Sequence, residues 1–157
     1  MDRDVLRSIR DLLTRRRVLA LAVLVDGEPE AGLLPFALRK DFGAVYVQAS
    51  DLARHARGLR AATQVGILVH ANDTPDEDPM QLARLTVQAS IRVLERDSDE
   101  FASASQRFVE RFPSAETTLS LGDFNLYELT LGRGRYIEGF ARAFNVGADT
   151  FKDIAAL

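Results

Sequence analysis

Several neighbouring apolar runs in this sequence are separated by turns that are too short to contain a helix. The first two runs are separated by Asp26-Gly27-Glu28-Pro29, and Asp-Gly is a dipeptide that two-residue β-hairpins favour. Parallel strands would need a crossover of a dozen or more residues, so the short turns favour antiparallel pairing. We expect strands at Val18–Val25, Glu30–Leu38, Ala44–Gln48, Val65–His70, Arg84–Glu95, Phe124–Leu131 and Arg135–Ala143.

The number of these strands predicts a mainly β fold. We expect an antiparallel barrel, because closure of the sheet into a barrel leaves no exposed strand edge. Peripheral helices are expected over residues 2–16 and over Asp97–Phe112, where apolar residues recur at helical spacing. The last two strands are expected to form a hairpin around Gly132-Arg133-Gly134, and one short helix is expected from Ala148. Residues 1–157 are thus predicted to form a single domain with an N-terminal helix and a short C-terminal tail.

The composition excludes several classes of site and partner. Cysteine is absent and only His55 and His70 are histidines, which excludes a disulfide framework, a thiolate zinc site and a His-rich metal centre. The net charge of −3 gives no general attraction to nucleic acid. The N-terminus is charged and amphipathic, unlike a signal peptide, and no apolar run reaches the length of a membrane span. We expect a cytoplasmic protein that binds neither nucleic acid nor membrane.

The segment Ala44–Leu68 is the strongest candidate for a binding site. A predicted strand ends at Ser50-Asp51, and a short basic helix that carries Arg54 and His55 follows at once. The start of a helix exposes free N–H groups and the positive end of the helix dipole, which favours a phosphate. Two simpler readings remain open: a solvated basic helix face, and a helix N-cap at Ser50 and Asp51.

Five short motifs, in order along nearly the whole chain, are similar to those of one known family. None of them is diagnostic alone, but their combined order and spacing is fairly specific. On these motifs the sequence resembles the pyridoxamine phosphate oxidase-like family of FMN-binding split barrels, and its haem-utilisation branch in particular. They are Pro35-Phe36-Ala37-Leu38, Ser50-Asp51-Leu52-Ala53-Arg54-His55, Leu82-Ala83-Arg84-Leu85-Thr86, Gly122-Asp123-Phe124-Asn125-Leu126-Tyr127 and Gly139-Phe140-Ala141-Arg142-Ala143.

The resemblance implies a homodimeric split barrel with FMN at the subunit interface. In the oxidases an Arg-Lys pair grips the flavin phosphate; Arg54 matches the Arg, and His55 stands where Lys is usual, a familiar variant of the haem-utilisation branch. Ser50 and Asp51 would lie beside the phosphate or the ribityl chain. Arg84 lies near a flavin-contacting position, and the alternative is an exposed strand terminus.

Two further motifs are expected at the flavin ring. The resemblance implies that the backbone at Pro35 and Phe36 lines the ring, and that Phe140 and Arg142 approach it from the partner subunit. Strand packing with a surface Arg is the alternative for the last pair. In the oxidases the first stretch also supplies an Arg and a Lys, but Leu33 and Leu38 stand in those positions here. Oxidation of pyridoxamine phosphate is therefore not expected.

The sequence leaves three functions open. The first is an FMN-dependent redox step on an unknown small-molecule substrate, with no residue that stands out as an obligate acid, base or nucleophile. The second is haem binding or haem utilisation, and the third is a flavin carrier or sensor without enzymatic activity. Haem-degrading members of the family carry a ligating His in a C-terminal extension, whereas no residue after His70 is a histidine in this sequence. We therefore expect weak haem binding and no haem turnover, with His70 at a strand end away from the ring pocket.

Overall fold

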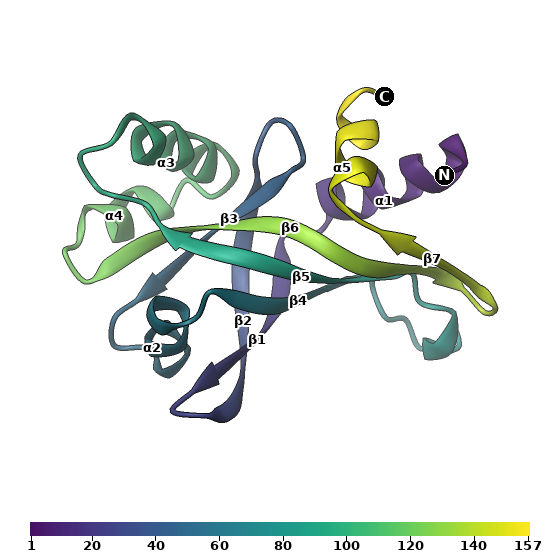
Figure 1. The fold of residues 1–157 in the computed structure, drawn as a ribbon, viewed down its shortest axis with the longest axis horizontal. Helices are drawn as coiled ribbons and strands as arrows, with labels where there is room; N and C mark the ends of the chain where they lie inside the picture. The colour runs from purple at the N-terminus through teal and green to yellow at the C-terminus, as the bar shows by residue number, and fades with distance from the viewer.

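Seven antiparallel strands form one sheet that closes into a barrel in the computed structural model, which describes residues 1–157 (Figure 1). The strands follow the order β3-β2-β1-β4-β5-β6, and pairing of β3 with β6 closes the ring. The seventh strand lies beside the far half of β6. This arrangement confirms the predicted mainly β antiparallel split barrel. The strands are β1 (Val18–Val25), β2 (Glu28–Leu38), β3 (Ala44–Ser50), β4 (Gln64–His70), β5 (Arg84–Val93), β6 (Phe124–Gly139) and β7 (Arg142–Val146).

Helices cover the outside and one end of the barrel. The first and last helices lie together, and α3 and α4 lie together on another side (Figure 1). None of the helices is long and apolar enough to cross a membrane. The helical segments are α1 (Arg3–Arg15), α2 (Arg54–Ala61), the 3₁₀ turn η1 (Pro79–Gln81), α3 (Asp99–Arg111), α4 (Ala115–Ser120) and α5 (Ala148–Ala155).

The turn between β1 and β2 has the geometry that its sequence predicts. Both Asp26 and Gly27 have positive φ angles, 54° and 83°. Two consecutive residues with positive φ are the requirement of the hairpin turn whose twist matches that of the flanking strands. The first hairpin is therefore confirmed down to its turn residues.

The predicted turn at Gly132-Arg133-Gly134 is wrong. These residues lie inside β6, which runs without interruption from Phe124 to Gly139, and the chain turns only at Phe140 and Ala141. The glycines permit a close approach to β5 instead of a reversal. A Cβ at Gly134 would overlap the carbonyl oxygen of Thr86, and one at Gly132 would lie 2.9 Å from that of Gln88. The register between β5 and β6 shifts at the same place, between Val87 and Ala89.

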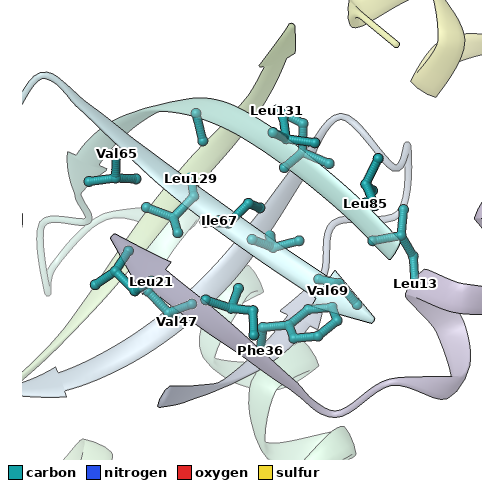
Figure 2. Packing of buried hydrophobic residues seen from close by; sticks show 14 of the residues in the cluster. Leu13, Leu21, Phe36, Val47, Val65, Ile67, Val69, Leu85, Leu129 and Leu131 are labelled. Carbon is teal, nitrogen blue, oxygen red and sulfur yellow. The ribbon is translucent and has the colours of Figure 1, made fainter. Parts of the chain in front are cut away.

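The main core fills the barrel and extends to α1 and α5. Alternating residues of β1, β4 and β5 point inward, and the Phe36 ring of β2 is fully buried among them (Figure 2). A smaller apolar cluster joins the outer side of β3 and β6 to α3 and α4, with Phe108 and Leu126 at its centre. Sequence periodicity missed α4, because its six residues are too few to show a helical repeat.

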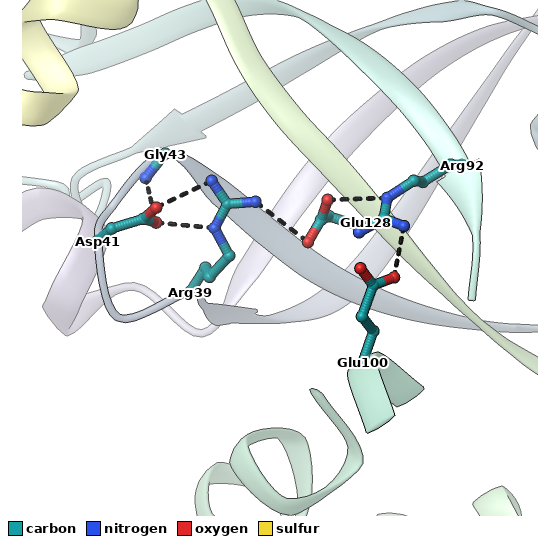
Figure 3. A network of polar contacts seen from close by, with 6 residues as sticks. All are labelled: Arg39, Asp41, Gly43, Arg92, Glu100 and Glu128. Carbon is teal, nitrogen blue, oxygen red and sulfur yellow. Dashed lines mark hydrogen bonds and ion pairs between the residues drawn. The ribbon is translucent and has the colours of Figure 1, made fainter. Parts of the chain in front are cut away.

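A chain of ion pairs fastens the β2–β3 turn to the middle of β6 and to α3 (Figure 3). Glu128 of β6, only 5% exposed, lies at its centre between Arg39 and Arg92. Arg39 continues to Asp41, and Arg92 continues to Glu100 of α3. A buried carboxylate is costly unless it is paired, and two guanidiniums supply that pairing here. The network therefore holds three distant segments in one arrangement.

We predict that Gly134→Ala destabilises the protein by about 1–3 kcal/mol, because the added methyl group overpacks a site already filled by backbone. Urea unfolding of the variant and the parent measures the difference. Gly122→Ala is the matched control, since a Cβ at Gly122 would meet nothing within 4 Å. Equal losses in both variants would contradict the close approach of β5 and β6.

The ion pair at the β2–β3 turn predicts a pH dependence. The Arg39 guanidinium, which donates to the Asp41 carboxylate, lowers the pKa of Asp41 below its ordinary value of 3.8, and partial burial opposes this only in part. A lowered folded-state pKa stabilises the protein above about pH 4, and the contribution is lost as the pH falls through the folded-state value. Because Asp41 is largely exposed, we expect Asp41→Asn to cost less than about 1 kcal/mol at pH 7.

The free-energy difference between parent and Asp41→Asn should shrink as denaturant unfolding is repeated at successively lower pH below 4. Asp73→Asn, which removes an exposed carboxylate that forms no ion pair, controls for the change in net charge. A difference that stays constant down to pH 2 would refute the contribution of this pair.

Candidate functional site

A groove of about 850 Å³, here called the outer groove, lies on the outer side of the barrel. Strand alternation explains why it is apolar and hollow. The outward positions at its centre hold small residues, Ala20 and Ala22 of β1 and Gly66 of β4, so little side chain fills the space. The groove is lined by Ala20, Leu21, Ala22, Ala31, Gly66, Ile67, Leu68, Thr86, Val87, Gln88, Arg133, Gly134, Arg135, Asn145 and Val146.

Two arginines give the outer groove its charge. Arg133 donates from Nε to Gln88 Oε1 at 2.8 Å, and Arg135 donates to Asn145 Oδ1 at 3.2 Å. Both partners are neutral amides, and neither guanidinium forms an ion pair with a carboxylate. Their positive charges therefore remain available to an anionic group on a ligand. Sequence reasoning missed this site because Arg133 was expected in a turn.

The residues predicted to bind phosphate do gather around the start of α2. The helix begins at Arg54, and its N-cap residue, Ala53, provides no side-chain acceptor for the first N–H groups. The alternative interpretation of Ser50 and Asp51 as a helix N-cap is wrong, because the chain makes a turn at Leu52 and the N-cap residue is Ala53. Arg54 is not free, since its Nε lies 2.6 Å from a carboxylate oxygen of Glu30.

Carboxylates also engage the neighbours of Arg54. Ser50 Oγ donates to Asp123 Oδ2 at 2.9 Å. Asp51 accepts from Asn125 and forms a 2.5 Å ion pair with Arg60. The acidic partners come from distant parts of the sequence, which is why a local reading of the basic helix did not include them. This end of the barrel is consequently less positive than the sequence predicted.

Two side chains near α2 keep unused polar atoms in buried positions. The His55 ring packs against Gly32, where a Cβ would lie 3.2 Å from Nδ1, and its buried Nε2 has no hydrogen-bonding partner. The Tyr127 hydroxyl is buried without a partner in bonding geometry. Burial raises the pKa of Tyr127, and the nearby Arg60 guanidinium opposes that shift. His55 Nε2 and the Tyr127 hydroxyl are thus two buried polar atoms without a hydrogen-bonding partner near the predicted phosphate site.

The remaining predicted residues lie elsewhere. Arg84 at the start of β5 donates to the carbonyl oxygens of Met80 and Leu82 and so braces η1. Phe140, 73% exposed, forms the tip between β6 and β7, where its N–H donates to the side chain of Gln81. Arg142 forms a 2.7 Å ion pair with Glu138.

Two residues of β2 were predicted to line the flavin ring. Pro35 is exposed, whereas the Phe36 side chain is buried in the core, so only the Phe36 backbone could face a ligand. The tip with Phe140 and the start of α2 lie at opposite ends of the molecule (Figure 1). A single chain therefore does not bring the predicted residues into one site.

Comparisons with known proteins place this chain among haem-utilisation proteins. It is 31% identical over 152 residues to the haem oxygenase HutZ of Vibrio cholerae, an alignment that covers 96% of this chain and 85% of HutZ. A crystal structure of HutZ from Vibrio cholerae, which names it a haem storage protein, matches this fold with a TM-score of 0.72. The sequence identity is 28%, and the match covers 88% of this chain and 92% of the HutZ chain. No family model matches the sequence.

Two more distant structures share the fold. A haem-binding protein from Mycobacterium smegmatis has a TM-score of 0.84 at 24% identity, and the match covers 98% of this chain but only 62% of the length of that protein. A protein of the pyridoxinephosphate oxidase family from Clostridium acetobutylicum has a TM-score of 0.70 at 12% identity, over 96% of this chain and 99% of that one. These likenesses concern the fold alone.

Proposed function

Because the chain belongs to the pyridoxamine phosphate oxidase-like split-barrel family, in the branch that contains HutZ, we propose that it binds haem. The relationship to HutZ over almost the whole chain carries this proposal. Haem replaces FMN as the preferred ligand of this proposal, because HutZ is named both as a haem oxygenase and as a haem storage protein.

The chemistry of the outer groove supports haem as its ligand. Haem has a large apolar ring with two carboxylates at one edge. The groove offers an apolar floor around Ala22 and Leu68, and about 850 Å³ of space is within the range of sites for cofactors. Arg133 and Arg135, which have no acidic partners, would receive the carboxylates.

We propose His70, which lies just beyond the residues that line the groove, as the iron ligand, in place of the expectation from the sequence that it lies away from the pocket and that haem binds weakly. It ends β4 and follows Gly66 and Leu68, the outward residues that line the groove, at the same two-residue spacing. Its ring is exposed, and its Nδ1 lies 2.6 Å from the carbonyl oxygen of Ala71. A proton held on Nδ1 by that carbonyl leaves Nε2 as a lone-pair donor, the usual arrangement of a metal-bound histidine. When bound, haem supplies redox chemistry or is itself the cargo.

FMN remains a second candidate on a specific observation. The start of α2 has no side-chain cap, and the buried His55 Nε2 has no partner, so a phosphate there would satisfy both. Against this, Glu30 already neutralises Arg54. An FMN-dependent oxidoreductase would therefore require Arg54 to exchange its carboxylate partner for the phosphate.

We predict that haem titration produces a stoichiometric Soret shift. His70→Ala should abolish the shift. The double variant Arg133→Gln, Arg135→Gln should weaken binding by about a hundredfold or more, because charged hydrogen bonds are worth about 1.5–3 kcal/mol each. His55→Gln, which removes the other imidazole, and Arg57→Gln, which removes a surface charge, are the controls and should bind haem as the parent does.

Three outcomes would count against this proposal. No Soret shift in the parent would exclude haem, and a full shift in His70→Ala would exclude the proposed ligand. Tight FMN binding that is lost in Arg54→Ala, together with weak haem binding, would favour the flavin site instead. Addition of a reductant under oxygen tests turnover separately, and the absence of a biliverdin-like product is expected.

We also propose that the protein is a homodimer. The outward sides of β1 and β2 expose Leu24 and Leu33, at 61% and 69%, beside the apolar groove. Exposed apolar surface of this extent is typical of an interaction site. A second copy would cover it and could bring the Phe140 tip of one chain to the strands of the other.

Light scattering should give twice the chain mass of 17.4 kDa, and Leu33→Glu should shift the protein toward the monomer, since an uncompensated charge in an apolar interface is strongly unfavourable. Leu52→Glu, at an 89% exposed position in the loop before α2, is the control. A stable monomer in the parent would refute the dimer.

A further inference from the structure

A second concavity, here called the basic cleft, lies between the end of α1, the β2–β3 turn and α3. Its volume is about 380 Å³, and it shares no lining residue with the outer groove. Three cations line it in addition to Arg39: Lys40 from the turn, and Arg107 and Arg111 from successive turns of α3. Neither haem nor flavin binding gives this cleft a role.

None of these three cations forms an ion pair with a carboxylate, whereas Arg39 beside them forms two. Arg107 Nε donates to the carbonyl oxygen of Leu38 at 2.8 Å. Arg111 donates to the carbonyl oxygens of Thr14 and Arg16. Carbonyl groups fix the direction of a guanidinium without neutralising its charge.

The acidic groups around the cleft are engaged elsewhere. Glu110 is the only carboxylate among the lining residues, and it accepts from the neutral amide of Gln106. Arg39, by contrast, is fully paired with Asp41 and Glu128 and adds little free charge. Three positive charges, those of Lys40, Arg107 and Arg111, therefore line the cleft with a single carboxylate that forms an ion pair with none of them.

Arg111 shows that this arrangement is costly in the absence of a ligand. Its guanidinium is half-buried over the rings of Phe36 and Phe112, at 5.5 and 5.9 Å from their centroids, and its buried Nε has no hydrogen-bonding partner. Burial lowers the pKa of Arg111, and repulsion from Arg17 and Arg107 lowers it further. Cations gathered around one cleft repel one another, and an anion bound among them would relieve that repulsion.

We propose that the basic cleft binds a phosphate group, held by Lys40, Arg107 and Arg111. A phosphate presents several acceptor oxygens in different directions, which matches donors that arrive from a turn and from two turns of a helix. A single carboxylate offers two oxygens in one plane. The same chemistry would suit inorganic phosphate or a small phosphate monoester.

Calorimetric titration with inorganic phosphate, and separately with glycerol phosphate as the monoester, tests this proposal. We expect saturable binding, and a rise in the melting temperature that chloride at equal ionic strength does not reproduce. Tighter binding of the monoester would identify a phosphorylated molecule as the ligand, and tighter binding of phosphate would identify the free ion. Lys40→Gln and Arg107→Gln should each weaken binding by about tenfold, while Arg3→Gln, which removes an exposed arginine from the start of α1, should leave it unchanged.

A second measurement separates binding from a structural role. In phosphate-free buffer at low ionic strength, Lys40→Gln should melt at the same temperature as the parent or higher, because it relieves repulsion within the empty cleft. Equal affinity in parent, Lys40→Gln and Arg107→Gln, equal stabilisation by chloride, or a fall in melting temperature for Lys40→Gln without phosphate would each overturn the proposal.

Discussion

The architecture depends on one strand, β6, which pairs with three others. Its first half, Phe124–Thr130, pairs with β3 and thereby closes the barrel. Its second half continues past the barrel and pairs with β7, while β5 follows its other edge for most of its length. Loss of this strand would leave β3 and β5 as open edges, the usual starting point for association between chains.

The same strand connects the barrel to its surface sites. Glu128 in its middle anchors the ion-pair network that fixes the β2–β3 turn and α3, which are two walls of the basic cleft. Arg133 and Arg135 farther along point to the outer groove. Residues of one strand thus contribute to the position of both concavities.

Much of the fold could be predicted because its signals are local. The β-branched and aliphatic run of β1, the Asp26-Gly27 turn and the helical spacing in α3 all reside within about a dozen residues, and the structure confirms them. The turn expected at Gly132-Arg133-Gly134 failed because glycine has two uses. A positive φ and a close approach by a neighbouring backbone both require the absence of a Cβ, and only the tertiary structure distinguishes them.

The candidate sites were less predictable because charge balance is not local. In the sequence, Arg54 and His55 read as an unpaired basic segment. In the fold, the Glu30 carboxylate of β2 lies beside Arg54 and pairs with it. The reverse holds for Arg107 and Arg111, which look like ordinary helix-surface arginines next to Glu110 until the fold shows that they donate to carbonyl oxygens and line one cleft with Lys40. Which cations are available to a ligand is therefore a property of the fold and cannot be read from a basic segment alone.

The packing of α1 against α5 has a consequence for the order of folding. The apolar face of α1, with Ile9 and Leu13 fully buried, is synthesised first, but it joins a core that includes Phe151 and Ile154 of the last helix. During synthesis, the part of this face that contacts α5 stays uncovered until the last residues of the chain have been made, even after the strands that contact α1 have formed. Binding by a chaperone at the N-terminal segment would shield that face during this interval.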